Sequence, residues 1–451
     1  MSDFFGLRIA LSALQAQRRA LDVTGHNVAN ANTPGYSRQR VDLVAESGPT
    51  VAAIHSRWRG AGQGVRAAGV LRIRDLFLER RAHQELAVKA SLTETNRVLG
   101  RIELAFGEPG DSGLAAQIAD FFAGWDDLAN HPDDPATRAQ LLERARTVVG
   151  TFHQTATALE ALRADSVSQA TALVDEVNSV AHQVAELNGA VQRAETAGLP
   201  SADLADQRDV LVQRLAELTG ATARPGENGV VDVYIGGSAL VRGTHDEQLA
   251  IQVAGGGGAQ VTWPAYGHPA TAGGEIGGLL GAANEVLPRY LAQLQDVAGA
   301  LHDEVNALHQ TGFDAAGDPA GQFFTMTAGT IDIDPAVAAD PSRIAASASG
   351  AALDGTLAQS IAELTGATTR YREMVVGLGV EAQAAGRRLD MQSGVVVDLE
   401  TARESVAGVN LDEEMVNMLS FQRAYEAGAR FMTAVDEAID TLINGTGVVG
   451  R

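Results

Sequence analysis

Few residues in this chain have the type and spacing that chemistry needs. His302 and His309 lie seven residues apart on one predicted helix, and the helical rise of about 10.5 Å between them is too long for sharing one metal ion. Asp314, Gly317 and Asp318 resemble part of a calcium loop, but the alternating oxygen ligands and the closing glutamate are missing. We therefore expect surface or hydrogen-bonded core histidines, an ordinary loop, and no metal or other cofactor.

Nucleophiles and phosphate-binding loops are equally scarce. The chain has no cysteine, which excludes disulfides, thiolate metal sites and a cysteine nucleophile, and Lys89 is its only lysine. Neither His-Glu-x-x-His nor Gly-x-Ser-x-Gly occurs. The many Asp and Glu residues lie mostly on polar faces of periodic segments, where a solvated surface is the default, although spacing alone leaves a carboxylate pair open. We expect a protein that is not an enzyme.

Length and charge further restrict the class of protein to which the chain can belong. The 451 residues favour two or three domains, and a hydrophobic content of 45% is that of a folded protein. A net charge of −22 argues against a nucleic-acid partner, because phosphate binding needs clustered Lys and Arg. No apolar run approaches ~18 residues, and the first residues lack the pattern of a cleaved signal peptide. We expect no membrane insertion and, if the protein is exported, a route without a cleaved signal peptide.

The clearest pattern is an apolar stripe at each end of the chain. Steps of three and four residues, typical of one helix face, connect the following residues near the N-terminus: Phe4, Leu7, Leu11, Leu14, Leu21 and Val28. The same steps connect these residues near the C-terminus: Met418, Phe421, Tyr425, Met432, Val435, Ile439 and Leu442. Because a short isolated helix is marginal in water, each stripe needs a partner.

The two ends also differ in charge. Residues 1–90 carry 13 Lys and Arg against 7 Asp and Glu, whereas the last 62 residues carry 4 against 11. Opposite charges attract, but an exposed ion pair is worth only about 0–1 kcal/mol, while burial of a large apolar side chain is worth about 1.5–3 kcal/mol. We therefore expect apolar contact to drive association of the ends and charge to set its orientation.

Between the ends, the pattern is helical with one β insertion. Repeated Asn followed by Pro34-Gly35 predicts that the first helix stops near Asn30 and leads into a type II turn. Residues 36–70 suit extended or hairpin structure, and Asn410 suits the cap of a last helix with Glu413 as its partner. Helical periodicity occupies most of the ranges 71–103, 117–218, 287–308 and 357–399. Residues 312–350 have a loop-like sequence.

This order predicts a mainly α fold, a long-helix, coiled-coil-like bundle formed by the N- and C-terminal halves with a small inserted β subdomain. Both ends would lie together and the middle of the chain would form the far end. The expected domains are an N-terminal segment paired with the C-terminal helix, a helical bundle made from two stretches, and the β insertion. Their expected boundaries are 1–65 with 400–451, then 66–224 with 284–399, and 225–283.

Both ends also carry recognisable motifs. Residues 27–39 (Asn-Val-Ala-Asn-Ala-Asn-Thr-Pro-Gly-Tyr-Ser-Arg-Gln) resemble the N-terminal signature of bacterial flagellar axial proteins, the family of rod, hook and hook-associated proteins. Residues 409–415 (Val-Asn-Leu-Asp-Glu-Glu-Met) and 421–427 (Phe-Gln-Arg-Ala-Tyr-Glu-Ala) resemble the C-terminal signature of the same family. Two internal stretches, 202–211 and 285–309, narrow the resemblance to its hook-associated members, which join hook to filament.

The resemblance implies a structural subunit that is exported through the flagellum and stacks outside the cell at the hook–filament junction. Implied partners are further copies of this chain, the hook protein, the next hook-associated protein and an export chaperone. Both ends would stay mobile in the free protein, and they would order only on assembly. The alternatives are a hook, rod or filament subunit and, more remotely, a flagellar cell-wall hydrolase.

The resemblance also assigns an assembly interface. It consists of the two apolar stripes together with motif residues at both ends: Asn27, Asn30, Thr33, Pro34, Gly35, Tyr36, Leu411 and Met415. The plainer interpretation is that the stripes dock on each other within one chain as ordinary core and that residues 27–36 form only a loop.

Overall fold

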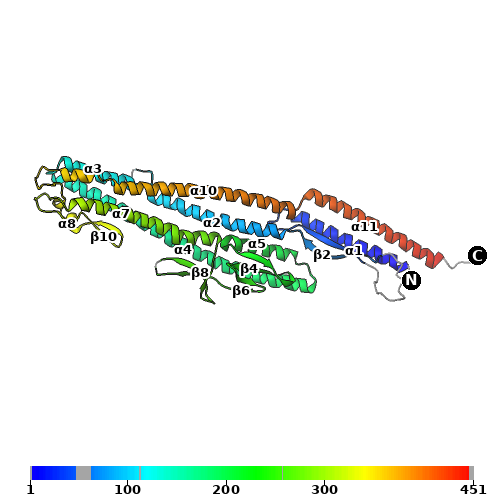
Figure 1. Ribbon diagram of the computed structural model, residues 1–451. Coiled ribbons are helices and arrows are strands. Elements are labelled where there is room, and N and C mark those ends of the chain that lie inside the picture. The colour runs from blue at the N-terminus through cyan, green and yellow to red at the C-terminus, as the bar shows by residue number, and fades with distance from the viewer. Residues whose placement is uncertain (1–2, 47–61, 111–112, 256, 446–451) are drawn as a thin grey trace, which may run out of the picture.

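Residues 3–46, 62–110, 113–255 and 257–445 are described by the structure, a computed structural model. In this part, the helices form a long rod that carries β structure on one side and a smaller module at one end (Figure 1). The first and last helices lie in that module, as expected. The opposite end of the rod is formed by residues 114–130 and 324–339, whereas residues 202–219, near the middle of the sequence, lie against the module, so the expectation that the middle of the chain forms the far end is wrong for this part.

The helices are α1 Asp3–Ala29, α2 Leu76–Phe106, α3 Leu114–Asn130, α4 Pro135–Ala197, α5 Ala202–Thr219, α6 Gly274–Gly281, α7 Leu287–His309, α8 Pro335–Ala339, α9 Thr356–Ala362, α10 Gly366–Ala407 and α11 Leu411–Asp440. The strands are β1 Gln39–Glu46, β2 Gly64–Arg72, β3 Thr222–Pro225, β4 Val231–Ile235, β5 Ser238–Arg242, β6 His245–Asp246, β7 Ala250–Val253, β8 Ala259–Trp263, β9 His268–Pro269, β10 Phe324–Thr327 and β11 Thr330–Ile333.

Helix α4 is the backbone of the rod. Its 63 residues correspond to about 95 Å of helix. The side chain of Asp134 caps its start by accepting from the Ala136 amide, Pro135 fits the first turn, and Gly198 ends it in the left-handed conformation with φ of 67°. Helices α2, α7 and α10 run alongside it, with α10 packed on both α2 and α7. The mainly α fold predicted from the sequence is therefore confirmed.

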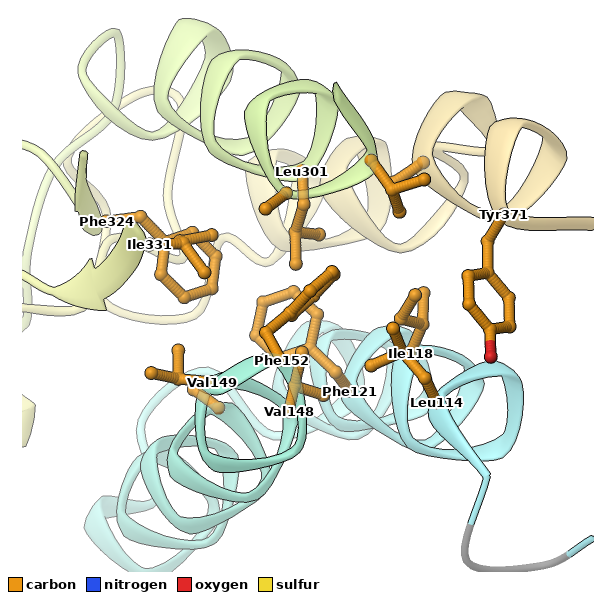
Figure 2. Close-up of a cluster of buried hydrophobic side chains, with 14 of the residues drawn as sticks. Leu114, Ile118, Phe121, Val148, Val149, Phe152, Leu301, Phe324, Ile331 and Tyr371 are labelled. Carbon is orange, nitrogen blue, oxygen red and sulfur yellow. The ribbon is translucent and has the colours of Figure 1, made fainter. Parts of the chain in front are cut away.

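Two apolar clusters hold the rod together. The first lies at the far end, where α3, α4, α7 and the β10–β11 hairpin meet around Phe121, Phe152 and Phe324 (Figure 2). The second joins the later half of α4 and helices α5 and α6 to the inserted strands, with Val177 and Trp263 at its centre. The apolar faces of α4 and α7 therefore form the core of the helical bundle.

The β insertion contains two antiparallel sheets, ordered β3-β4-β5-β6 and β7-β8-β9. The insertion expected at 225–283 differs at its end, since α6 occupies Gly274–Gly281. Glycine disfavours helix, but here Ile276 and Leu279 are buried, and a Cβ on Gly278 would lie 2.6 Å from the Ser91 carbonyl oxygen of α2. Close packing on α2 thus outweighs local helix propensity.

Two further segments depart from the sequence prediction. The loop-like range 312–350 contains the β10–β11 hairpin, which Asn306 of α7 fixes by accepting from the Phe323 and Phe324 amides and donating to the Phe324 carbonyl. The N-terminal segment expected to end at residue 65 continues, because β2 runs to Arg72 and pairs with β1. The hairpin expected within 36–70 is thus present and slightly longer.

The candidate ligand residues have structural roles. His309 is fully buried, with Nδ1 2.8 Å from the Gly321 carbonyl oxygen and Nε2 accepting from the Ala345 amide. Asp314 accepts from the Ala316 and Asp318 amides and so closes an ordinary turn. Among the described residues, no three metal-binding side chains gather, and no helix has the length and apolar character to cross a bilayer.

The first cluster gives a direct test of the rod. Replacing the fully buried Phe121 with alanine should lower the free energy of unfolding by about 3–5 kcal/mol, because the ring leaves a cavity among Trp125, Phe323 and Phe324. Phe77→Ala is the matched control, since Phe77 is 68% exposed. Urea unfolding followed by circular dichroism measures both, and equal losses would contradict the assignment of the core.

Candidate functional site

The terminal module consists of α1, the β1–β2 hairpin and α11, and it is the part of the molecule that contains both family-like motifs. Helices α1 and α11 pack antiparallel (Figure 1). Near the rod, Asn27 contacts Glu414, and farther out Leu14 lies against Gly428, where a Cβ would be 3.3 Å from the Leu14 Cδ2. The glycine that interrupts the C-terminal stripe therefore makes room for a leucine of the N-terminal stripe.

The two predicted stripes largely face each other in the single chain. Half-buried residues of the N-terminal stripe are Leu7, Leu14, Leu21 and Val28. Half-buried residues of the C-terminal stripe are Met418, Phe421, Met432, Val435 and Ile439. Exposed members of the predicted interface are Leu11, Leu411, Met415, Tyr425 and Leu442, and the side chain of Phe4 lies outside the described part. Docking within one chain, the plainer interpretation, is what the structure contains.

Helix α1 has a second packing face that its leucine spacing does not reveal. Ala16, Ala20 and Thr24 are all below 4% exposed and lie on the side next to the β1–β2 hairpin. Small side chains let the hairpin approach, and Ser12 Oγ accepts from the Val65 amide of β2. Helix α1 therefore lies between the hairpin on one side and α11 on another.

A buried carboxylate joins the two ends of the chain. Glu414 is only 2% exposed and is the one buried residue in the described part of α11. Arg38 Nε donates to its Oε1 at 2.8 Å, and Asn27 Nδ2 donates to its Oε2 at 3.0 Å. Arg38 also forms an ion pair with Glu413 at 2.8 Å. The start of α11 is capped by Asn410 alone, whose side chain accepts from the Asp412 and Glu413 amides.

Asn27 is fully used in this cluster. Its amide donates to the Gln39 carbonyl and to Glu414, and its oxygen accepts from the Gln39 amide and the Tyr36 hydroxyl. All of the hydrogen-bonding capacity of one asparagine side chain is thus satisfied at a site that is 1% exposed. An aspartate here would lose two donors and face Glu414 with a second negative charge.

Residues between the helices complete the connection. The Arg38 amide donates to the Ala407 carbonyl at the end of α10, and the Ile73 amide donates to the Arg38 carbonyl. One residue of the N-terminal motif therefore touches the end of α10, the start of α11 and the segment that leads into α2.

Three aspartates on α5 hold the module to the rod. Asp206 accepts from the Ser37 hydroxyl and amide, Asp203 accepts from Gln39, and Asp209 pairs with Arg72 and with Arg74. We call this set of residues, together with the Glu414 cluster, the joint. The spacing of three places the aspartates on one face of α5, turned toward the terminal module.

Charge and burial shift the ionisation of groups in the joint. Burial would raise the pKa of Asp209, but the neighbouring guanidinium groups of Arg74, Arg72 and Arg208 outweigh it and hold that pKa below the ordinary value. Burial, together with the negative charges of the surrounding carboxylates, raises the pKa of the Tyr36 hydroxyl. Asp209 is therefore held ionised, and Tyr36 neutral, at neutral pH.

The turn after α1 fits against α5. The Tyr36 amide bonds the Thr33 carbonyl across Pro34-Gly35, and Gly35 has φ of 78°, so the predicted type II turn is confirmed. A Cβ on Gly35 would run into the Val210 side chain of α5. Thr33 donates to Asn30 at 3.1 Å, and the Asn30 side chain donates to the His26 carbonyl of α1 at 3.0 Å.

The sequence located part of this site. Asn27 and Tyr36, both predicted as interface residues, lie in the joint. The aspartates on α5 and the arginines at 72 and 74 were not among the predicted interface residues. Two signals for them existed: the three-residue spacing of Asp203, Asp206 and Asp209, and the motif-like stretch 202–211 that contains them.

The motifs of the terminal module have counterparts in known proteins. Residues 7–36 match the family model described as flagella basal body rod protein, and residues 403–445 match that of the flagellar basal body rod FlgEFG protein C-terminal region. Residues 99–324, half of the chain, match the helical domain of flagellar hook-associated protein FlgK. The chain belongs to the FlgK family of flagellar hook-associated proteins.

Individual FlgK-family relatives agree with this match. Flagellar hook-associated protein 1 of Bacillus subtilis (strain 168) is 29% identical over the whole of both chains. The protein of the same name from Escherichia coli (strain K12) is 29% identical to this chain. That alignment covers 70% of this chain and 59% of the E. coli protein. Among solved structures, the flagellar hook junction protein FlgK from Burkholderia pseudomallei aligns with a TM-score of 0.50 and 27% identity, over 55% of this chain and 47% of that one.

The fit of the turn to α5 predicts the effect of one methyl group. Gly35→Ala should destabilise the joint by about 1–3 kcal/mol more than Gly107→Ala, because both glycines have positive φ but only Gly35 meets a side chain. Hydrogen exchange of residues 27–39 measures the effect. Adding Val210→Ala to Gly35→Ala should recover most of the loss, and no recovery would contradict the contact.

The lowered pKa of Asp209 predicts a pH dependence. Its folded-state pKa lies below that of the unfolded chain, so its stabilisation is fully present above the unfolded value of about 3.9 and disappears as the pH falls through the folded value. Asp209→Asn should cost about 3 kcal/mol near neutral pH and progressively less below about pH 4. Urea titrations across pH measure this, with the exposed Asp165→Asn as control; a loss independent of pH would refute the ionic role.

Proposed function

We propose that this chain is a structural subunit of the bacterial flagellum at the hook–filament junction, and that it assembles through its terminal module. One observation carries the proposal. The two segments that match flagellar rod-protein models separately, 7–36 and 403–445, pack together in one module beyond the end of the rod. Between them lies a rod matched by the hook-associated helical domain.

The surface of the terminal module supports an assembly role. Helix α11 buries only Glu414 in its described part, and large apolar side chains of this helix remain open to solvent, among them Met415, Val416 and Leu419. Exposed apolar groups gathered on one element favour a protein partner. The exposed members of the predicted interface, such as Leu11 and Leu411, would contact neighbouring subunits, while the half-buried stripes hold α1 to α11.

The helical domain favours a junction subunit over the sibling alternatives. Rod-like terminal segments are shared with the wider axial family, but the match over 99–324 is to the hook-associated helical domain. The named relatives are hook-associated or hook junction proteins. The buried carboxylates of the joint, Glu414, Asp206 and Asp209, are paired with arginines, so they lend no support to a hydrolytic function.

The proposed surroundings follow from this role. Neighbouring copies, the hook protein and the next hook-associated protein would contact the terminal module or the rod, and an export chaperone would bind the chain before assembly. The protein would form part of the external flagellum. Mobility of the two ends before assembly stays a prediction.

The apolar contact between the stripes of α1 and α11, which we call the seam, can be tested in cells that lack the native chain. Phe421→Asp should abolish incorporation, since it places a charge on the half-buried face of α11 against α1 while the rod stays folded. Antibody labelling of flagella measures incorporation, and the unaltered chain should give a band at the distal end of the hook. Leu353→Asp, at a residue 77% exposed on the far end of the rod, is the control.

Each failure in that experiment has its own meaning. Labelling of the unaltered chain along the hook or the filament would contradict the junction role. Normal incorporation of Phe421→Asp would contradict assembly through the terminal seam.

A further inference from the structure

A buried histidine, His83, lies on α2 beside the joint. It is 8% exposed, and its Nε2 atom has no hydrogen-bond partner among the described residues. It borders a cavity of about 80 Å³ whose walls also come from α5 and from strands β3 and β4. Buried polar groups are normally hydrogen-bonded, so an imidazole in this position is unusual. The assembly role proposed above does not use this residue.

Glu79 is the acidic neighbour of His83, one turn earlier on the same helix. The His83 Nε2 atom lies 4.0 Å from Glu79 Oε2, which is too long for a hydrogen bond. Glu79 is also 8% exposed, and its Oε2 pairs with Arg74 at 2.8 Å and with Arg403 of α10 at 3.1 Å. One buried carboxylate therefore lies between two arginines and a histidine.

Both arginines have a second carboxylate within reach. Arg74 also pairs with Asp209 of α5, and Arg403 also pairs with Glu400, one turn earlier on its own helix. Either arginine can therefore give up Glu79 without becoming an unpaired charge. Arg74 directly precedes α2 in the chain, whereas Arg403 belongs to α10. Only the pair between Arg403 and Glu79 therefore joins two separate helices.

The last turns of α10 depend on that pair. Leu399 is the last buried residue of the helix. Beyond it, Arg403 reaches α2 and, at 3.4 Å, the Gln213 side chain of α5, while the Ala407 carbonyl accepts from the N-terminal motif. Polar contacts, rather than apolar packing, thus hold the end of α10 where it leads into α11.

His83 is neutral at neutral pH. The charged residues around it and its cavity are Glu79 and Arg80 of α2, Arg74 before α2, Asp209 of α5 and Arg403 of α10. Burial is the main influence and lowers the pKa of the imidazole; Glu79 and Asp209 raise that pKa, and Arg403 and Arg74 lower it further. The strands that border the cavity contribute no charged side chain to it.

We propose that His83 is a proton-operated switch beside the joint. A charged imidazole in a buried position needs a counter-ion, and Glu79 lies one turn away on the same helix. Protonated His83 pairs with Glu79, Glu79 then gives up Arg403, and the last turns of α10 are released from α2. A pair within one helix thus replaces a pair between two helices. This inference concerns the subunit itself and does not depend on where the subunit assembles.

The direction of the pH effect follows from the histidine. Its folded-state pKa lies below that of the unfolded chain, so the stabilisation is fully present above about pH 6.5 and is lost as the pH falls from there toward the folded value. The loss that Asp209 causes begins only near about pH 4. The two groups therefore act in different pH ranges.

Hydrogen exchange of the full-length chain tests the switch. Amides of residues 400–408, with each rate divided by its intrinsic rate, should lose protection as the pH falls from about 7.5 to about 5. Residues 170–184 of α4, measured in the same sample, should keep theirs. His83→Gln should abolish the pH-dependent loss, because glutamine takes up no proton. Arg403→Gln should show the low protection already at neutral pH, because it lacks the pair that joins the helices.

His26→Gln is the matched control. His26 is the histidine nearest the other side of the joint, with its half-exposed ring 3.7 Å from Asp203, and its replacement should leave the loss of protection unchanged. A loss that persists in His83→Gln, a loss that disappears in His26→Gln, or full protection in Arg403→Gln at neutral pH would each overturn the switch. None of these results depends on antibody labelling of flagella, so the proposed function is tested separately.

Discussion

Burial of the Glu414 carboxylate is the constraint on which the terminal module depends. A charge removed from water is tolerated only with close partners, and Arg38 and Asn27 of the opposite end of the chain supply them. This one requirement fixes where α11 begins relative to α1. It also fixes the direction in which α11 leaves α10, because the Arg38 backbone is bonded to Ala407. The apolar seam extends the pairing outward but is only half buried.

The molecule divides its stabilising interactions between two regions. The rod has two closed apolar clusters and uses close packing of aromatic and aliphatic side chains. The terminal module has small alanines, a thin seam and a polar joint, and it leaves large apolar groups in solvent. A subunit built in this way has a complete core where it must be stable alone and an unsatisfied surface where it must bind. The proposed assembly role follows from that division.

The sequence predicted what local periodicity and turn chemistry determine. The helical rows, the end of α1, the Pro34-Gly35 turn and the Asn410 cap all follow from short-range rules. It missed α6, because the benefit of glycine at 278 appears only when α2 lies against it. It also missed the anchor on α5, since Asp206 and Arg72 are 134 residues apart and nothing in their spacing shows that they meet. The polar partners of a buried charge are a property of the tertiary fold.

The antiparallel pairing of the first and last helices has a consequence for quality control. A ribosome makes α1 first and α11 last, so the surface formed by both exists only in a chain translated to its end. A prematurely terminated product would possess the whole rod yet have Arg38 and Asn27 without their carboxylate. If assembly uses the terminal module as proposed, such truncated copies would be excluded from the growing structure by their own geometry.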